Sequence, residues 1–188
     1  MKNRILRFKK IVLAGVFGTL IAACSTALQP ERYAAEKPQL DLQRYFNGTL
    51  DAHGMFQDRS GAVIKRFTVV MRCSWVGDVG TLDEDFSYSD GTRQKRVWTL
   101  RKVAPGRYLG SAPDVIGQAV GIVSGNALRW NYVLALPVDG KLVKVDFEDW
   151  MFMIDDQVML NRAAMSKFGF ALGQVTLSFN KRGAPRAP

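Results

Sequence analysis

The sequence predicts an all-β protein, an antiparallel up-and-down barrel of about 8–10 strands over residues 42–180. Short runs that alternate apolar and polar residues follow one another, and turn signals such as Asp-Gly and Pro-Gly separate them. No long stretch has the periodicity of a helix, and no internal repeat of fixed period occurs. Short strands at hairpin spacing are typical of a barrel or a sandwich, and we expect the barrel.

The expected strands follow one another along the chain with short connections. The longer runs are rich in β-branched and aromatic residues, which favour extended structure, and the connections contain residues that turns prefer. Residues 113–119 could hold one helical turn. The expected strands comprise residues 44–56, 62–75, 81–89, 93–103, 107–112, 118–124, 126–136, 141–154, 157–169 and 170–179.

Alternation along each strand separates an inward face from an outward face, because residues two apart point to the same side of a sheet. One apolar and one polar face per strand is what a closed barrel in water needs. The clearest apolar faces are Phe67, Val69, Met71, Cys73 and Trp75; Leu128, Trp130, Tyr132, Leu134 and Leu136; and Val175, Leu177 and Phe179.

Residues 1–23 have the parts of a secretory signal peptide, namely five basic residues, an apolar run and small residues before a cleavage point. The apolar run is shorter than the ~18 residues that span a membrane. The segment Ile21-Ala22-Ala23-Cys24 resembles the lipobox of bacterial lipoproteins. This resemblance implies cleavage before Cys24 and the attachment of acyl chains such as palmitate, which hold a protein to a bilayer when two or more are present. The alternative is an ordinary signal peptide followed by a chance cysteine.

Ser25 follows Cys24 at the position where a signal for retention in the inner membrane has Asp. By resemblance to enteric lipoproteins, this favours the outer membrane, with the protein facing the periplasm. Residues 24–41, which contain two prolines and mixed charges, are expected to form the lipidated cysteine and a tether. Residues 181–188 are expected to be a disordered tail. Cys73 would then have no disulfide partner, and we expect it to be buried.

Composition excludes several classes of function. Removal of residues 1–23 leaves 165 residues, enough for one domain, with 21 Lys and Arg against 17 Asp and Glu. The resulting net charge of +4 is too small to indicate a nucleic-acid partner. His53 is the only histidine and is expected to lie exposed on a strand. We therefore expect no metal site, no cofactor and no Ser-His-Asp triad.

Four charged residues are in phase with apolar ones and are therefore expected to point inward: Glu84, Arg96, Asp149 and Arg162. Buried charges must be paired, hydrogen-bonded or hydrated. They could form a structural ion-pair network, or the assumed register could be off by one residue. Alternatively, they form the polar end of a ligand cavity and meet a carboxylate or phosphate headgroup. Four aromatic residues would then surround an acyl chain: Trp98, Trp130, Tyr132 and Phe147.

Several motifs together resemble one family of bacterial lipoproteins, known as domain of unknown function 3833. They are YFNGTLDAHGMFQDRSG, GTLDEDFSYSDG, RVWTL, VDFEDWM and MLNRAAMSKFGFALGQVTLSF, and they extend from about Tyr45 to Phe179. The resemblance implies a lipocalin-like barrel, and members tend to be encoded near enzymes that act on fatty-acyl chains. It implies no catalytic residues.

The sequence supports three hypotheses about function. The first is a lipid-anchored barrel that binds or carries a hydrophobic ligand such as an acyl lipid. The second is an enzyme that modifies envelope lipids or fatty-acyl chains, with Glu84 or Asp149 as acid or base beside Arg96 and Arg162. The third is a structural envelope barrel filled with side chains. The volume of the barrel interior distinguishes the first hypothesis from the third, and the sequence indicates no protein partner.

Overall fold

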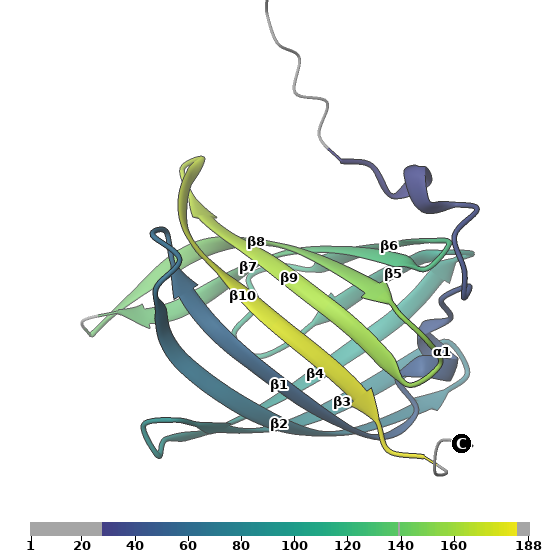
Figure 1. Ribbon diagram of the computed structural model, residues 1–188, viewed down its shortest axis with the longest axis horizontal. Coiled ribbons are helices and arrows are strands. Elements are labelled where there is room, and N and C mark those ends of the chain that lie inside the picture. The colour runs from purple at the N-terminus through teal and green to yellow at the C-terminus, as the bar shows by residue number, and fades with distance from the viewer. Residues whose placement is uncertain (1–27, 139, 184–188) are drawn as a thin grey trace, which may run out of the picture.

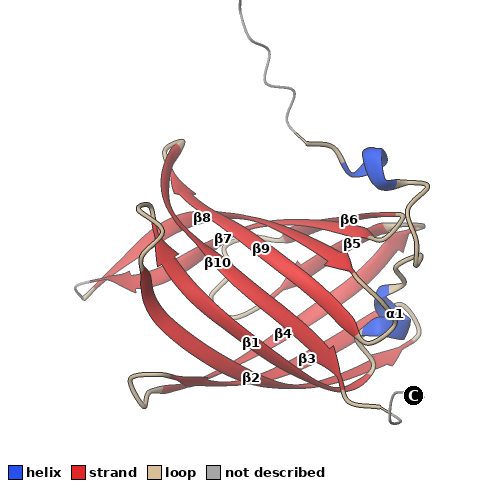
Figure 2. Cartoon of the chain, in the orientation of Figure 1, coloured by secondary structure: helices blue, strands red, loops and turns tan. Residues whose placement is uncertain are grey.

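A computed structural model describes residues 28–138 and 140–183, which form a closed barrel of ten antiparallel strands (Figures 1 and 2). Each strand pairs with the next along the chain, and the last pairs with the first. The predicted up-and-down barrel is thus confirmed. Within the described residues, no helix is long and apolar enough to cross a membrane. The strands are β1 Gly48–Asp58, β2 Val63–Val76, β3 Val79–Tyr88, β4 Arg93–Ala104, β5 Arg107–Ser111, β6 Ala119–Ser124, β7 Ala127–Val138, β8 Lys141–Met153, β9 Val158–Lys167 and β10 Phe170–Lys181.

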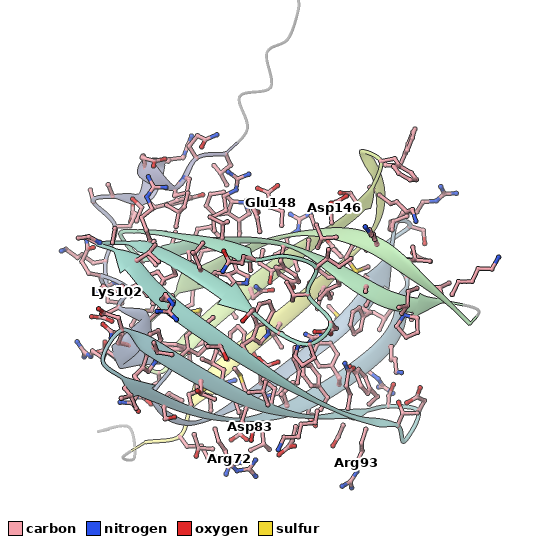
Figure 3. All side chains as sticks on the ribbon, turned by 180° about the vertical axis from the view of Figure 1, so that it is seen from behind. Arg72, Asp83, Arg93, Lys102, Asp146 and Glu148 are labelled. Atoms are coloured by element: carbon pink, nitrogen blue, oxygen red, sulfur yellow. The ribbon has the colours of Figure 1, made fainter. Side chains whose placement is uncertain are left out.

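The inner faces of the strands form one hydrophobic core, as the alternation predicts. In β2, Phe67, Val69, Met71 and Cys73 are buried, whereas the residues between them lie toward the outside. The Cys73 thiol is free, and burial raises its pKa to about 12, so it is a packing residue and a poor nucleophile. Cys24 lies outside the described residues. Charged side chains cover the outer surface, where those of Arg72 and Arg93 point away from the barrel (Figure 3).

One end of the barrel is closed by the short helix α1, Leu42–Tyr45, and we call it the capped end. The Asp41 side chain accepts hydrogen bonds from the first backbone N–H groups of α1, at 2.8 Å from Gln43. Leu42 and Tyr45 are almost completely buried, and the Tyr45 hydroxyl donates to the Phe179 carbonyl at 3.1 Å. The sequence predicts a strand from residue 44. The structure begins β1 at Gly48 because the preceding residues fold across the mouth of the barrel.

Residues 28–40 also differ from the predicted tether. A 3₁₀ helix, η1 Pro30–Tyr33, lies on the outside of β6 and β7. The Tyr33 ring contacts Trp150 and Phe152 edge-on, with ring centroids 5.9 and 5.0 Å apart. The carbonyl of Tyr33 lies so close to Gly125 that a Cβ atom there would be only 1.6 Å away, so only glycine fits this turn. These contacts hold this segment against the barrel wall.

The folded region also extends beyond the predicted boundary at residue 180. Lys181 belongs to β10, and the Arg182 guanidinium forms two hydrogen bonds with the Asp51 carboxylate, at 2.7 and 2.6 Å. These contacts join the last described strand to β1. Residues 184–188 of the predicted tail lie outside the described residues.

The barrel wall has one region where its pairing is interrupted. β5 and β6 are short, so β4 pairs with β5 only from Thr99 onward, and β7 pairs with β6 only up to Asn131. The loop of residues 112–118 fills the remaining space and pairs with β7 through Val115 and Leu134. Among the described residues, the 93–98 stretch of β4 has backbone pairing with β3 alone. We call the boundary between residues 93–98 and the 112–118 loop the lateral seam.

Candidate ligand-binding cavity

A cavity of about 110 Å³ lies in the barrel interior, between α1 and the inward-pointing charged residues. This volume is more than the ~10–15 Å³ that one water molecule needs, but it is well below the ~300–1,000 Å³ of a typical small-molecule pocket. The interior is therefore neither solidly filled nor widely hollow. Its apolar lining comprises Leu42, Phe46, Met71, Leu82, Phe86, Trp98, Leu100, Leu128, Trp130, Met151 and Phe179, and its polar lining comprises Glu84, Arg96, Tyr132, Asp149 and Asn161.

The structure brings together most of the residues that the sequence singled out. Six of the eight predicted ligand contacts line the cavity: Glu84, Arg96, Trp98, Trp130, Tyr132 and Asp149. Phe147 is buried but stands behind this lining, where it stacks on Tyr132 with ring centroids 5.1 Å apart. Phe147 therefore positions the Tyr132 ring. The role of these residues in binding a ligand stays a prediction.

The prediction that Arg162 points inward is wrong. Arg162 is exposed on the outside of β9 and donates a hydrogen bond from Nε to the Gln174 side chain at 2.9 Å. The inward face of β9 contains Met159, Asn161 and Ala163 instead. In β9 apolar residues occur on both faces, since Leu160 is exposed while Met159 is buried, so alternation alone could not determine the register.

Asn161 takes the place that the sequence assigned to Arg162. It is buried, and its amide group donates to Asp149 Oδ2 at 3.4 Å. The Tyr132 hydroxyl donates to the same oxygen at 3.3 Å. The other carboxylate oxygen of Asp149, Oδ1, is buried without a hydrogen-bond partner among the described residues. Asp149 can therefore accept or share one more hydrogen bond.

Trp130 fits into the cavity wall because two neighbouring strands have no side chain opposite it. A Cβ atom at Gly110 in β5 or at Gly121 in β6 would lie 2.3 or 2.4 Å from the indole ring. The indole therefore packs directly on the backbone of both strands. Its other side meets Trp98 edge-on, with ring centroids 5.8 Å apart. This arrangement places two tryptophans side by side in the cavity lining.

Arg96 is neutralised by Asp114, an acid that the sequence did not single out. Both Nε and one terminal nitrogen of Arg96 donate to Asp114 Oδ2, at 3.0 and 2.7 Å. Asp114 belongs to the loop of residues 112–118, so this ion pair connects β4 to the loop across the lateral seam. Alternation identifies inward residues only within strands, and for that reason no signal in the sequence pointed to Asp114.

Glu84 is the other buried acid of the cavity. It stands directly opposite Arg96 in the β3–β4 pairing, yet its carboxyl group forms no hydrogen bond with another described residue. Burial raises the pKa of Glu84 to about 7 in spite of the opposing effect of Arg96. Burial likewise raises the pKa of Asp149 to about 7, although the hydrogen bonds from Asn161 and Tyr132 favour its charged form. Both groups therefore exchange protons near neutral pH.

The charges in the cavity do not suit an anionic ligand. Arg96 is the one cation in the cavity lining, and it is already paired with Asp114. Two further carboxyl groups, Glu84 and Asp149, would repel a carboxylate or phosphate. When the carboxyl groups of Glu84 and Asp149 are protonated, they can donate a hydrogen bond to a carbonyl group. When they are ionised, they can accept a hydrogen bond from a hydroxyl or amide group. The anionic headgroup expected from the sequence stays a prediction, and these charges favour an uncharged polar group in its place.

Comparison with known proteins connects this barrel to one family. The model of DUF3833, described as a protein of unknown function, matches residues 18–181. This chain belongs to the DUF3833 family. The resemblance to DUF3833 noted in the sequence is thereby confirmed. No curated protein matches this DUF3833 chain.

Solved structures that are similar to this chain have very different sequences. The S-type phycobiliprotein lyase CPES from Guillardia theta has 8% sequence identity and a TM-score of 0.57, and the match covers 85% of this chain and 100% of that chain. A de novo designed fluorescence-activating β-barrel has 12% identity and a TM-score of 0.43, with 76% of this chain and 99% of that chain covered. At such identities, the first of these similarities establishes the barrel fold alone.

Proposed function

We propose that this DUF3833 protein binds a hydrophobic ligand, such as an acyl lipid, whose uncharged polar group meets Glu84 and Asp149. The observation that carries the proposal is Asp149 Oδ1, which is buried in the lining of a largely apolar cavity without a hydrogen-bond partner among the described residues. A buried polar atom without a partner is costly, so a ligand that supplies the missing hydrogen bond gains affinity from it. Trp98 and Trp130 would pack against the apolar part of the ligand.

Entry of such a ligand requires the cavity to enlarge. At about 110 Å³ it accepts a few heavy atoms, and an acyl chain needs several times this volume. The lateral seam is the natural route, because the Arg96–Asp114 ion pair and side-chain packing hold its two sides together there, in place of a continuous ladder of backbone hydrogen bonds. Separation of the 112–118 loop from β4 would expose Phe86, Tyr132 and the carboxyl groups to the ligand.

The proposed location follows from the first residues of the sequence. The signal peptide and Cys24 would place the protein on a membrane through acyl chains, at the periplasmic face of the outer membrane. In cells, replacement of residues 1–24 by an ordinary cleavable signal peptide should move the protein from the outer-membrane fraction to the soluble periplasm once the membranes are washed at about 1 M ionic strength. Retention of this protein in the washed membrane fraction would contradict lipid anchoring.

To test whether the protein binds a ligand, residues 25–188 are produced in the periplasm and purified gently. Native mass spectrometry then detects any bound molecule. We expect a stoichiometric apolar molecule. Leu82→Phe, which places a larger side chain in the cavity, should abolish its retention. Leu160→Phe is the matched control, because Leu160 lies on the outside of β9, and it should retain the molecule. A protein that stays empty after incubation with total envelope lipid would leave a structural barrel as the better account.

An enzyme is the second candidate, and one observation favours it. Two buried carboxyl groups that line one cavity and have a pKa near 7 can act as general acid and base at neutral pH. Glu84→Gln and Asp149→Asn separate the two functions. In a binding protein each change should weaken ligand retention in a graded manner, whereas in an enzyme it should stop turnover while the substrate still binds.

A further inference from the structure

The end of the barrel opposite α1, which we call the distal end, exposes apolar side chains at three neighbouring hairpins. These hairpins join β1 to β2, β7 to β8 and β9 to β10, and they lie at the left of Figure 1. The strands are consecutive around the barrel from β2 through β1, β10, β9 and β8 to β7. The exposed residues are Val63 and Ile64 in the first hairpin, Val138 and Leu142 in the second, and Phe168, Phe170 and Leu172 in the third.

Phe168 is the most exposed of these residues and has an unfavourable backbone conformation. Its side chain is 85% exposed, and it has φ of 51°, in the left-handed region that bulky residues avoid. The next residue, Gly169, has φ of 80°, so the turn has two positive φ values. Asn-Gly or Asp-Gly is preferred in such turns. A phenylalanine here is costly to the fold and gains nothing from the core, which points to a contact outside the molecule.

Cations surround the exposed apolar residues. The three hairpin segments, residues 57–66, 138–144 and 165–172, contain six Lys and Arg but only two Asp, one of which, Asp139, lies outside the described residues. Lys65 is paired with Asp90 of the β3–β4 hairpin at 2.8 Å, whereas Arg59, Arg66 and Lys144 form no ion pair within the described part of the chain. The Lys167 ammonium lies 5.2 Å from the centroid of the Phe168 ring. This combination of exposed apolar residues and cations suits the interface of an anionic bilayer.

We infer that the distal end is a membrane-docking surface for anionic lipid, with Phe168, Phe170 and Leu142 inserted among the acyl chains. A second copy of this chain would present the same positive charge and be repelled, so a bilayer is the occupant that charge complementarity favours. In Figure 1 the β9–β10 hairpin rises above the barrel at the distal end, whereas the first described residues rise above it nearer the capped end.

The test is flotation of vesicles with a protein that begins at Ser25 and has no lipid. All described contacts lie within residues 28–183, so this protein keeps the complete barrel. We expect it to float with vesicles of phosphatidylcholine and phosphatidylglycerol, and to dissociate when ionic strength rises from about 0.1 M to about 1 M. Pure phosphatidylcholine vesicles should bind much less protein. These results are independent of the cavity ligand and of the anchor.

A pair of variants makes the test specific to the distal end. Phe168→Asn with Phe170→Ser should lower binding roughly tenfold, because two large apolar side chains no longer enter the bilayer. Asn suits the left-handed turn, so this variant should fold at least as well as the parent. Val76→Ser is the control, since Val76 is 83% exposed but lies at the capped end. Equal loss in both variants, or no binding of the parent protein to anionic vesicles, would overturn the inference.

Discussion

The two ends of this barrel differ in where their apolar residues lie and in whether their cations are paired. At the capped end, α1 fills the mouth with Leu42, Tyr45 and Phe46. The nearby cations are engaged, as in the pairs of Arg44 with Asp156 and of Arg182 with Asp51. At the distal end, apolar residues such as Phe168 and Leu142 face outward, and several cations have no partner among the described residues. The capped end contributes stability to the fold. The exposed apolar residues of the distal end and the buried acids of the cavity cost stability, and we propose that they contact other molecules.

The largest difference between the two ends should appear when a leucine at each end is replaced by alanine. Leu42→Ala removes a completely buried side chain from the cap and should lower the free energy of unfolding by about 2–5 kcal/mol. Leu142→Ala removes a side chain that is 75% exposed and should change it by less than about 0.5 kcal/mol. Urea denaturation followed by tryptophan fluorescence measures both values. Similar losses would show that the distal end also belongs to the folded core.

The buried acids of the cavity should cost stability at high pH. The folded protein holds the Glu84 proton up to pH about 7, whereas the unfolded chain releases it near the usual 4.5. The contribution of the Glu84 proton to the free energy of unfolding is therefore complete below pH 4.5 and is lost as pH rises through about 7. Glu84→Gln should remove this part of the pH dependence and raise the free energy of unfolding at pH 8 by on the order of 2–3 kcal/mol.

Thermal or urea unfolding of the Glu84→Gln protein at pH 4 and pH 8 measures the effect. Leu160→Phe, on the outside of β9, serves as a control without a titrating group. If Glu84→Gln destabilises the protein at pH 8, the cluster is a structural ion-pair network in which the Glu84 carboxylate is stabilised by Arg96. That outcome would show that the cavity residues, like those of the capped end, contribute to the stability of the fold.

The cavity wall depends on the close contact of Trp130 with Gly121 in β6. Gly121→Ala puts a methyl group 2.4 Å from a rigid indole ring, so Trp130 must move into the cavity. We expect a loss of about 1–3 kcal/mol and a reduced capacity for the ligand. Val120→Ala, at the neighbouring and partly exposed position, is the control. Near-ultraviolet circular dichroism reports the changed tryptophan packing, and an unchanged spectrum would argue against this contact.

The smallest effect is expected at the tip of the β9–β10 hairpin. Phe168→Asn relieves the left-handed conformation of a bulky residue and should leave stability unchanged or raise it by up to about 1 kcal/mol. A thermal melt of this variant beside the parent protein measures the difference. A clear destabilisation would show that the Phe168 ring supports the fold, and it would weaken the distinction between the two ends.

The sequence predicted the barrel and most of the cavity residues because both depend on a local pattern. Alternation in β3, β4, β7 and β8 correctly placed Glu84, Arg96, Trp130 and Asp149 inside. It failed in β9, where apolar residues occupy both faces and Arg162 was assigned to the wrong one. It could not find Asp114, whose position in a loop obeys no period. Nor could it predict that η1 docks on β6 and β7, since this contact depends on surfaces formed by distant strands.

By itself, the sequence determined the fold class and the two faces of most strands, because the backbone of a strand imposes a period of two on every side chain. Tertiary structure alone decided the ion pair between Arg96 and Asp114, the unpaired oxygen of Asp149, the size of the cavity and the gathering of three hairpins at the distal end. These features depend on strand register and on barrel closure, which bring together residues far apart in the chain. Such contacts have no signature in any single segment.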